Sequence, residues 1–567
     1  MKRPAAFAYW LDEVPPPGVV FLSALQHVGL ICSLIAIPLA VAREAGLAPD
    51  QTVNLVAVSM LVLGITTILQ TLQRGPVGSG LLAPSSFSGA YLAPSLIAAK
   101  VGGLPLVFGM TILGGLFEAA LSRGLRYLRP FLPPEIAGFV VVLVGVGVGG
   151  LGVRYVLGVG MPEPASHREL GVAMLTLGVM VGLNVWGRGM PRLFCALIGM
   201  LCGYAAALGL GVLGEDDFGR VMAAPGFRLP QVGDMGWSFD GALVFPFAIG
   251  AVAACLKTVG DLTICQRIND ADWSRPELRG ISRGTLANAI GTSLAGVVGT
   301  TGLATSTSSI GLAGATGVTS RRVGHATGAI LILLAFLPQF SELLSIMPRA
   351  LMGAALMFVA AFIFVSGLQI IASRLLDVRR TFVIGLSFIS AIAVDISPEY
   401  FKTLPAVLQP LVSSSMVTGM VMAILLNLVF RIGTRQVQRL EIGAEGVNPR
   451  ALGEFMDACG ASWGARRDVI ERAKFNLQQS IETLAGSGLA NGPLLAEASF
   501  DEFTLSVRVS YEGVPLELPE RRPSDDEIME SDEGERRLAG FMLRKFADRV
   551  AASHRNGRSI VSFQFIH

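Results

Sequence analysis

Charged residues are scarce in this chain. Lys, Arg, Asp and Glu together make up 15% of its 567 residues, whereas soluble domains carry roughly 25%. Hydrophobic residues make up 52%, and the mean hydropathy is +0.60. This composition argues against an ordinary soluble protein and indicates a membrane protein. The net charge of +2 gives no sign of a nucleic-acid partner, and we expect none.

Cysteine is also sparse, and its pattern argues against two kinds of site. The six cysteines lie mostly in apolar runs and form no CxxC pair, so neither a disulfide framework nor a zinc site is expected. We expect no metal, no cofactor and no catalytic residue. The start of the chain, MKRPAAFAYWLDEVPPPG, is polar and Pro-rich. Residues 1–16 are therefore assigned to a cytoplasmic segment, and the apolar run from Val19 to a retained membrane span.

Long apolar runs fill residues 17–432. About fourteen of them are long enough to cross roughly 30 Å of hydrocarbon, which predicts an all-α polytopic protein. Clusters such as Arg123, Arg126 and Arg129 fall in alternate loops, and the loops between them carry fewer cations. The positive-inside rule then places both termini in the cytoplasm of a multi-pass inner-membrane protein.

Two stretches interrupt these apolar runs. Residues 299–321 (GTTGLATSTSSIGLAGATGVTSR) and residues 75–95 (GPVGSGLLAPSSFSGAYLAPS) are rich in residues that favour helix breaks. In lipid, broken backbone survives only where it is buried in protein or lines a polar cavity. The stretches fall in the third and tenth spans, so we expect two inverted seven-span repeats whose interrupted helices meet at a substrate site. The alternative is that both stretches are small-residue packing faces.

Several segments share their order and spacing with one known family. They are Gln26-His27 in SALQHVGL, LPPEIAGFVVVLVGVGVGGLGV (132–153), KTVGDLT (257–263), the broken stretch with Gly311, Thr316 and Arg321, SIMPRALMGAALMFVAAFIFVSGLQII (345–371) and MVTGMVMAILLNLVF (416–430). Over residues 17–432 the chain resembles the nucleobase–ascorbate transporters, the xanthine/uracil permeases. The resemblance implies a core domain, spans one to four and eight to eleven, that moves against a gate domain. It also implies a homodimer, a nucleobase-like substrate and symport with protons, or alternatively with sodium.

The chain departs from the family's pattern at the expected site. The family's eighth-span Glu falls on Lys257, and its tenth-span Gln/Glu-Asn pair falls on Ser308 and Ser309. A lysine ammonium can only donate hydrogen bonds, so a contact from Lys257 would favour a carbonyl-rich or anionic ligand. Alternatively, Lys257 pairs with Asp261 one turn along the same helix.

Other candidates carry two interpretations each. Phe87 stacks on the substrate ring or is an apolar packing residue, and His27 donates to a substrate carbonyl or fixes the third span. Asp395 lies in an otherwise apolar span, where an acidic residue is a candidate for a functional role. The alternative is that it lies near the outer interface of the membrane. The candidate substrate-binding residues are thus Phe87, Lys257, Ser308, Ser309, Gly311 and His27, and the coupling or structural polar network comprises Asp261, Gln26, Thr316 and Asp395.

The chain changes character after Phe430. Residues 433–449 read as a charged linker, and residues 450–567 as a small soluble α/β domain in the cytoplasm. Helical spacing predicts helices over 465–488 and 535–552, and alternation predicts strands over 503–513 and 559–566.

This tail resembles the ATPase fold of anti-sigma-factor kinases and histidine kinases. Its nucleotide-contact positions are substituted, however. The Asp of the adenine-binding motif falls on Tyr511, and the lid glycines fall on Arg537 and Ala539. We therefore interpret it as a degenerate regulatory or docking domain with a cytoplasmic protein partner.

The sequence thus predicts a secondary active permease, not an enzyme, for a nucleobase-like substrate such as xanthine, uracil or urate. Because of Lys257, an anion carrier for sulfate, bicarbonate or carboxylates on the same fold is an alternative. A transporter-like sensor that signals through its tail is a second alternative. A membrane-anchored ATPase is a third, which the substituted nucleotide positions disfavour.

Overall fold

The computed structural model describes residues 1–567 except 6, 129–132, 160, 162, 274–275, 373–375, 377, 406–408, 413, 431–435, 444–448, 464–466, 487–488, 501–503, 524–531, 556 and 567. The chain divides into two units, Met1–Asn427 and Leu428–His567. Each is described by itself below.

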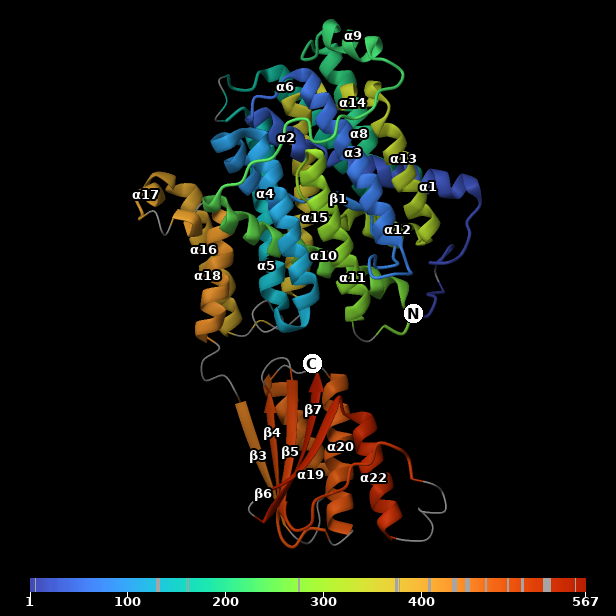
Figure 1. The fold of residues 1–567 in the computed structure, drawn as a ribbon, viewed down its shortest axis with the longest axis vertical. Helices are drawn as coiled ribbons and strands as arrows, with labels where there is room; N and C mark the ends of the chain where they lie inside the picture. The colour runs from blue at the N-terminus through green and yellow to red at the C-terminus, as the bar shows by residue number, and fades with distance from the viewer. Residues whose placement is uncertain are drawn as a thin grey trace. The chain divides into compact units, whose positions relative to one another are not determined.

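The first unit is almost entirely helical (Figure 1). Its elements are α1 (Pro17–Ser33), α2 (Ala36–Glu44), α3 (Pro49–Thr71), β1 (Ser85–Phe87), η1 (Gly89–Tyr91), α4 (Leu92–Leu128), α5 (Pro134–Leu157), α6 (His167–Trp186), α7 (Met190–Leu193), α8 (Cys195–Gly209), α9 (Glu215–Ala223), α10 (Gly241–Asn269), α11 (Leu278–Val298), β2 (Leu303–Thr305), α12 (Thr307–Thr316), α13 (Arg321–Ala335), α14 (Pro338–Ser345), α15 (Arg349–Ile371), α16 (Val378–Ile396), α17 (Pro398–Lys402), η2 (Gln409–Val412) and α18 (Ser415–Phe430).

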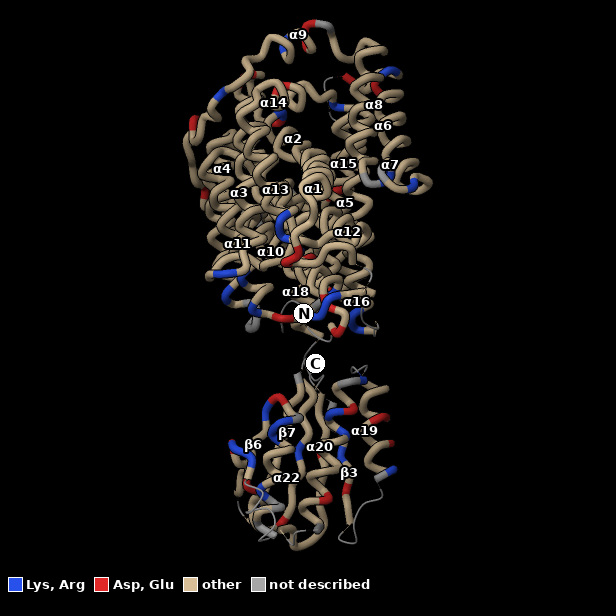
Figure 2. Tube along the Cα trace, turned by 90° about the vertical axis from the view of Figure 1, so that its right-hand side faces the viewer, with Lys and Arg blue, Asp and Glu red and all other residues tan. Residues whose placement is uncertain are grey.

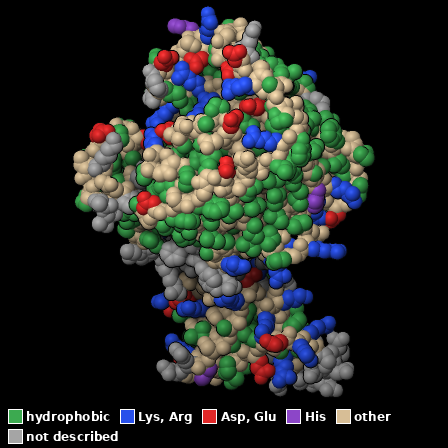
Figure 3. All heavy atoms as spheres, turned by 45° about the horizontal axis from the view of Figure 1, so that its top comes forward, with side chains coloured by type: hydrophobic (Ala, Val, Ile, Leu, Met, Phe, Trp, Pro, Cys, Tyr) green, Lys and Arg blue, Asp and Glu red, His purple; other side chains and the backbone are tan. Residues whose placement is uncertain are grey.

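Length and hydropathy mark this unit as a multi-pass membrane protein. Within the described residues, seven helices are long and apolar enough to cross a bilayer, or up to eight if the bent pair α13 and α14 is one span. Helix α4 is broken in its interior, where Gly103 has a φ of 68° and Pro105 follows. Charged residues gather toward the two ends of the unit (Figure 2), and hydrophobic side chains form a broad surface over it (Figure 3). Such a surface suits contact with lipid.

Glycines allow the helices of this unit to cross closely. Where α5 meets α15, a Cβ at Gly138 would lie 2.8 Å from the carbonyl oxygen of Gly367, and a Cβ at Gly367 would lie 2.8 Å from that of Gly138. The same reciprocal contact, at 2.6 Å, joins Gly64 of α3 to Gly328 of α13. Close backbone approach through small residues is how membrane helices gain packing without a hydrophobic driving force.

The second unit is an antiparallel sheet with helices packed on it (Figure 1). Its elements are β3 (Gln436–Ile442), α19 (Pro449–Trp463), α20 (Arg467–Gly486), β4 (Leu494–Phe500), β5 (Thr504–Glu512), α22 (Asp532–Phe546), β6 (Arg549–Arg555) and β7 (Arg558–Ile566), with strand order β3-β4-β5-β7-β6. Side chains on β5 alternate between buried and more exposed. The buried ones join Leu477 and Leu543 of the helices in one core.

Two expectations for this unit were wrong in part. The described portion of the expected linker contains strand β3, which pairs with β4 along its whole length; residues 433–435 and 444–448 lie outside the described residues. The helix expected over 535–552 ends at Phe546, and Arg549 begins strand β6, which pairs with β7. Pairing across the sheet outweighs the helix propensity of the two alanines in β6.

Tyr511 shows what replaces the acid of the nucleotide-binding motif. Its hydroxyl donates to the carbonyl of Val514 at 2.9 Å and accepts from the N–H of Leu516 at 3.0 Å. The side chain is buried, so the phenol is engaged by its own chain.

The glycine crossing yields a stability prediction. Gly367→Val should destabilise the protein by about 1–3 kcal/mol, because the added carbons meet the backbone of α5 at 2.6–2.8 Å. Thermal unfolding of the detergent-solubilised chain measures the change. Gly178→Val in α6 is the matched control, since nothing lies within 4 Å of its Cβ position. Equal effects of the two substitutions would contradict the close-approach argument.

Candidate functional site

A short two-stranded ladder joins the two interrupted stretches. Strands β1 and β2 are antiparallel, with Ser85 opposite Thr305 and Phe87 opposite Leu303. Each strand leads into a helix, β1 into η1 and α4 and β2 into α12. Because the ladder satisfies part of their backbone groups and side chains satisfy others, these broken segments can lie inside a membrane unit. Two helix N-termini, which carry partial positive charge, therefore begin at one small sheet.

A serine side chain caps the start of each of the two helices. The Ser88 hydroxyl accepts from the N–H of Ala90, and the Ser306 hydroxyl accepts from the N–H of Ser309, each at 3.3 Å. A cap satisfies one of the first N–H groups of a helix, and the others of that turn have no partner within the helix. The start of α12 thus retains donors for a ligand.

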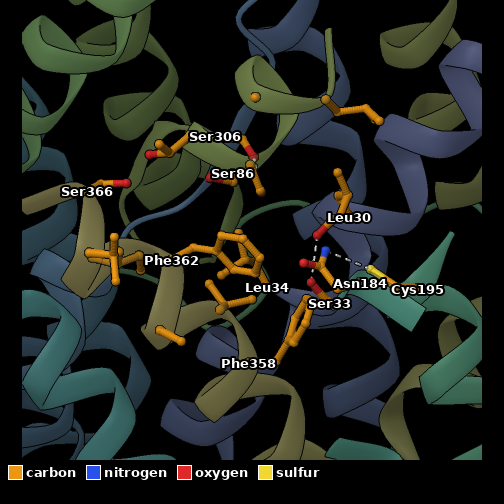
Figure 4. A pocket seen from close by; sticks show the side chains of 18 of the residues that line it. Leu30, Ser33, Leu34, Ser86, Asn184, Cys195, Ser306, Phe358, Phe362 and Ser366 are labelled. Carbon is orange, nitrogen blue, oxygen red and sulfur yellow. Dashed lines mark hydrogen bonds between the residues drawn. The ribbon is translucent and has the colours of Figure 1, made fainter. Parts of the chain in front are cut away.

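A cavity of about 820 Å³ lies beside the ladder. In Figure 4, Ser86 and Ser306 lie together on one wall, and Phe358 and Phe362 belong to α15, which contributes another part of the lining. The rings of Phe358 and Phe362 are 5.2 Å apart and nearly perpendicular. The lining combines apolar and aromatic side chains with a few polar groups, as small-molecule sites do.

The structure brings half of the predicted residues to this cavity. Those that line it are Phe87, Lys257, Ser308, Gly311 and Thr316, and those outside its lining are His27, Gln26, Ser309, Asp261 and Asp395. Helical periodicity explains the split in α12. Ser308 and Gly311 share one face, whereas Ser309 is fully buried on another.

The residues outside the lining have different surroundings. Gln26 and His27 are buried in α1, and among the described residues Nδ1 of His27 has no hydrogen-bond partner. Asp395 is exposed on α16. Asp261 is buried and reaches the site through Lys257.

Lys257 and Asp261 form the electrostatic centre of the site. The ammonium of Lys257 donates to Asp261 Oδ2 at 2.7 Å, to the carbonyl of Thr305 at 2.5 Å and to the hydroxyl of Thr307 at 3.1 Å. Asp261 accepts in addition from the hydroxyls of Thr305, at 2.7 Å, and Thr307, at 2.8 Å. The pair therefore ties α10 to β2 and to the first residue of α12.

This geometry bears on the two alternatives for Lys257. An ammonium has three donors, and all three are directed at protein acceptors. Lys257 lines the cavity, but a bond to a ligand would require it to release one of these partners. The ion pair with Asp261, one of the two alternatives, is present.

Sequence analysis missed several polar residues of the cavity lining. Ser366 and Gln369 of α15, Asn184 of α6 and Arg192 of α7 all line the cavity. Polar Ser366 and Gln369 stand three residues apart in an otherwise apolar run, which was a usable signal. Nothing local marks Asn184 or Arg192, because their place depends on how α6 and α7 pack.

Comparison with known proteins identifies the family. The model of the permease family, that of the xanthine/uracil permeases, matches residues 18–400. The chain belongs to this family. Its members are transporters, so this permease is a transport protein of the membrane and not an enzyme.

Characterised relatives match this permease over most of their length. The xanthine permease XanQ of Escherichia coli is 28% identical over 442 residues, which cover 75% of this chain and 94% of XanQ. The xanthine permease XanP of the same organism is 27% identical over 437 residues, 74% of this chain and 94% of XanP. The uric acid permease PucJ of Bacillus subtilis is 28% identical over 429 residues, 73% of this chain and 93% of PucJ.

Solved structures give a weaker similarity. The transmembrane domain of a cyanobacterium bicarbonate transporter, BicA, matches 74% of this permease and 98% of that domain at 15% identity, with a TM-score of 0.45. Murine Slc26a9, an anion transporter in the inward-facing state, matches 78% of this permease and 73% of that chain at 13% identity, with a TM-score of 0.49.

The buried ion pair yields a double-mutant prediction. Lys257→Met should cost about 3–5 kcal/mol, because it leaves the Asp261 carboxylate buried without its counter-charge. The double variant Lys257→Met/Asp261→Leu should recover part of that loss, and thermal unfolding in detergent measures both. Arg220→Met is the control, since its pair with Asp217 lies at the surface, with side chains 45% and 37% exposed, and should matter by less than about 1 kcal/mol. Strictly additive losses in the double variant would show that the two side chains do not interact.

Proposed function

We propose that this permease is a secondary active transporter that carries a nucleobase-like substrate, such as xanthine, urate or uracil, by ion-coupled symport. The observation that carries the proposal is the cavity beside the β1/β2 ladder, with Phe87 and the start of α12 in its lining. The relatives named for xanthine and uric acid support the substrate class.

The chemistry of the cavity fits a planar ring with carbonyl groups. Backbone N–H groups in the first turn of α12 can donate to ring carbonyls, and the positive end of the helix favours the negative charge on those oxygens. Phe87 on the ladder side and Phe358 and Phe362 on α15 offer aromatic surface to the ring faces. Gln369 supplies both a donor and an acceptor for the ring edge.

An anion carrier is the second candidate. Arg192 lines the cavity, and a guanidinium there favours an anionic ligand. Lys257 adds little to this candidate because Asp261 neutralises its charge. Urate in its anionic form would satisfy both the aromatic walls and Arg192, so we place it among the first substrates to test.

The proposal includes the finer architecture. We assign fourteen spans in two inverted repeats; the break of α4 at Gly103, the short apolar helices α8 and α18, and the matched positions of β1 and β2 support this assignment. Both termini would lie in the cytoplasm, the permease would be a homodimer of the inner membrane, and the coupling ion would be a proton, with sodium as the alternative. The second unit would serve as a regulatory or docking domain for a cytoplasmic protein.

A ligand screen tests the substrate class. Purified permease is heated with purines, pyrimidines, urate, dicarboxylates or sulfate, each near 100 times its dissociation constant where solubility allows. A bound ligand should then stabilise the fold by roughly 2.7 kcal/mol. We expect a response to an oxidised purine or to uracil. A response to sulfate or dicarboxylates alone would reject the nucleobase proposal in favour of an anion carrier.

The open space at Gly311 gives a sharper test of where the substrate binds. Nothing lies within 4 Å of its Cβ position, and the residue lines the cavity. Gly311→Val should therefore leave folding intact, while its methyl groups enter the cavity and weaken binding tenfold or more, about 1.4 kcal/mol. Isothermal titration of the ligand found in the screen measures the loss. Gly385→Val on α16, also open but outside the lining, should bind normally, and normal binding by Gly311→Val would place the substrate elsewhere.

A further inference from the structure

Helix α4 carries an acid that the substrate cavity does not explain. Glu118 lies in the second arm of α4, inside an apolar segment long enough to span a membrane. Its side chain is 0% exposed. Among the described residues, its hydrogen-bond partners are all neutral. A carboxylate without a counter-charge in a membrane segment is costly to keep ionised, and such a residue is a candidate for a functional role.

The surroundings of Glu118 are polar and specific. Oε1 accepts from the phenol of Tyr91 at 2.7 Å and from the hydroxyl of Thr292 at 3.4 Å, and Oε2 accepts from Nδ2 of Asn288 at 2.8 Å. The Tyr91 ring is held by close packing, since a Cβ at Gly302 would lie 2.2 Å from it and one at Gly114 2.7 Å from it. Glu118 therefore lies in a well-packed site formed by neutral hydrogen-bond donors.

The same neighbours connect Glu118 to the ladder beside the substrate cavity. Asn288 Nδ2 also donates to the carbonyl of Leu303 at 3.1 Å, and the Leu303 N–H donates to the Thr292 hydroxyl at 3.2 Å. Leu303 is the residue of β2 that pairs with Phe87 of β1. The backbone of the ladder thus shares two side chains, Asn288 and Thr292, with the carboxylate.

These two side chains have a second arrangement available when the acid is protonated. The Thr292 hydroxyl has one hydrogen and two acceptors in reach, Glu118 Oε1 and the carbonyl of Leu303, both at 3.4 Å. Asn288 Oδ1 is buried and, among the described residues, has no hydrogen-bond partner. A rotated Asn288 amide would present Oδ1 to accept a hydrogen bond from a Glu118 carboxylic acid, and its Nδ2 would then leave the carbonyl of Leu303. The network therefore accommodates both states of the acid. In the ionised state Asn288 Nδ2 bonds both Glu118 and the Leu303 carbonyl, and in the protonated state Thr292 can replace Asn288 at that carbonyl.

From this geometry we infer that Glu118 is the protonation site coupled to substrate transport, taking up one proton with the substrate and releasing it after translocation. The inference rests on the proposed symport function. In the protonated state, Thr292 replaces Asn288 at the carbonyl of Leu303, so the tie between this network and the ladder that carries Phe87 changes with the protonation of Glu118. Proton binding then raises the affinity for the substrate, and substrate binding raises the affinity for the proton by the same factor, because thermodynamic linkage is reciprocal.

The other titratable groups near Glu118 do not share this position. The groups that face it are the phenol of Tyr91 from η1 and the thiol of Cys255 from α10. Helix α11 contributes Asn288 and Thr292, which do not titrate. Helix α2, which also packs on α4, brings Glu44 to Lys100 on the other arm of α4. Asp261 is held by Lys257 and two threonines, so it has a counter-charge beside it, whereas the hydrogen-bond partners of Glu118 are neutral.

The variant Glu118→Gln tests the inference in the full-length permease. Glutamine keeps the size of the side chain and its acceptor for Tyr91, and its amide can donate to Asn288 Oδ1, so it imitates the protonated acid. Wild-type affinity for xanthine, or for the ligand found by the screen, should fall up to tenfold per pH unit above the titration midpoint, because one proton binds with the substrate. The variant should bind at all pH values with the affinity that the wild type shows at low pH.

Transport in proteoliposomes supplies the second readout. An inward proton gradient should drive accumulation of labelled substrate by the wild type, whereas Glu118→Gln should exchange substrate but accumulate none. Glu163→Gln, which removes an exposed acid outside the cavity lining, should behave as wild type. Proton-driven accumulation by Glu118→Gln, or accumulation by the wild type under a sodium gradient alone, would overturn the inference.

A measurement without substrate separates this inference from the proposed function. Infrared difference spectra across pH should show a carboxylic-acid C=O band in the wild type that is absent in Glu118→Gln. If no nucleobase is bound or carried, the proposed function fails, and the inference of coupled transport fails with it even where the band is present. If nucleobases are carried but no band depends on Glu118 at any pH, only the Glu118 inference fails.

Discussion

The β1/β2 ladder is the constraint on which the rest of the site depends. Two chain segments that cannot continue as helices would leave polar backbone unsatisfied in lipid, and their mutual pairing, together with side-chain partners of Leu303 and Thr305, removes that cost. Three residues on each side suffice because Lys257 and Asp261 add a side-chain tie to the end of β2 and the start of α12. The two helix N-termini and the position of Phe87 follow from this arrangement, and the cavity lies beside it.

The sequence predicted what depends on local composition. Gly, Ser and Thr inside apolar runs located both broken segments, and the spacing of four residues indicated the pair of Lys257 with Asp261. Pairing of residue 85 with residue 305 joins distant parts of the chain, so no local pattern fixes its register. Periodicity within α12 did hold more information than was used, since it separates Ser308, on the cavity face, from Ser309. His27 was assigned from the resemblance, which specifies a position on α1 but not the direction of the side chain.

The same distinction holds in the second unit. Its central strands β5 and β7 and helix α20 agree with the pattern-based expectations. The two segments assigned otherwise, β3 and β6, are the two edges of the sheet. Edge strands carry polar and charged side chains that discourage further pairing. In QVQRLEI and RVAASHR that composition resembles a linker and a helix end, so the feature that protects the edge also hides the strand from sequence analysis.

Two buried acids in one membrane unit illustrate how environment divides their roles. Asp261 has a cation and two hydroxyls, so its charge is compensated and holds the ladder in place. Glu118 has neutral donors, so its protonation leaves no buried counter-charge unpaired among these partners. Because Lys257 cancels Asp261, the ladder side of the cavity has no net side-chain charge, and its attraction for a ligand comes from helix N-termini that do not titrate. A permease built this way can keep its substrate contacts constant with pH. On the Glu118 inference, a dependence of binding on protons would enter from behind the ladder, through the residues that Leu303 shares with Glu118.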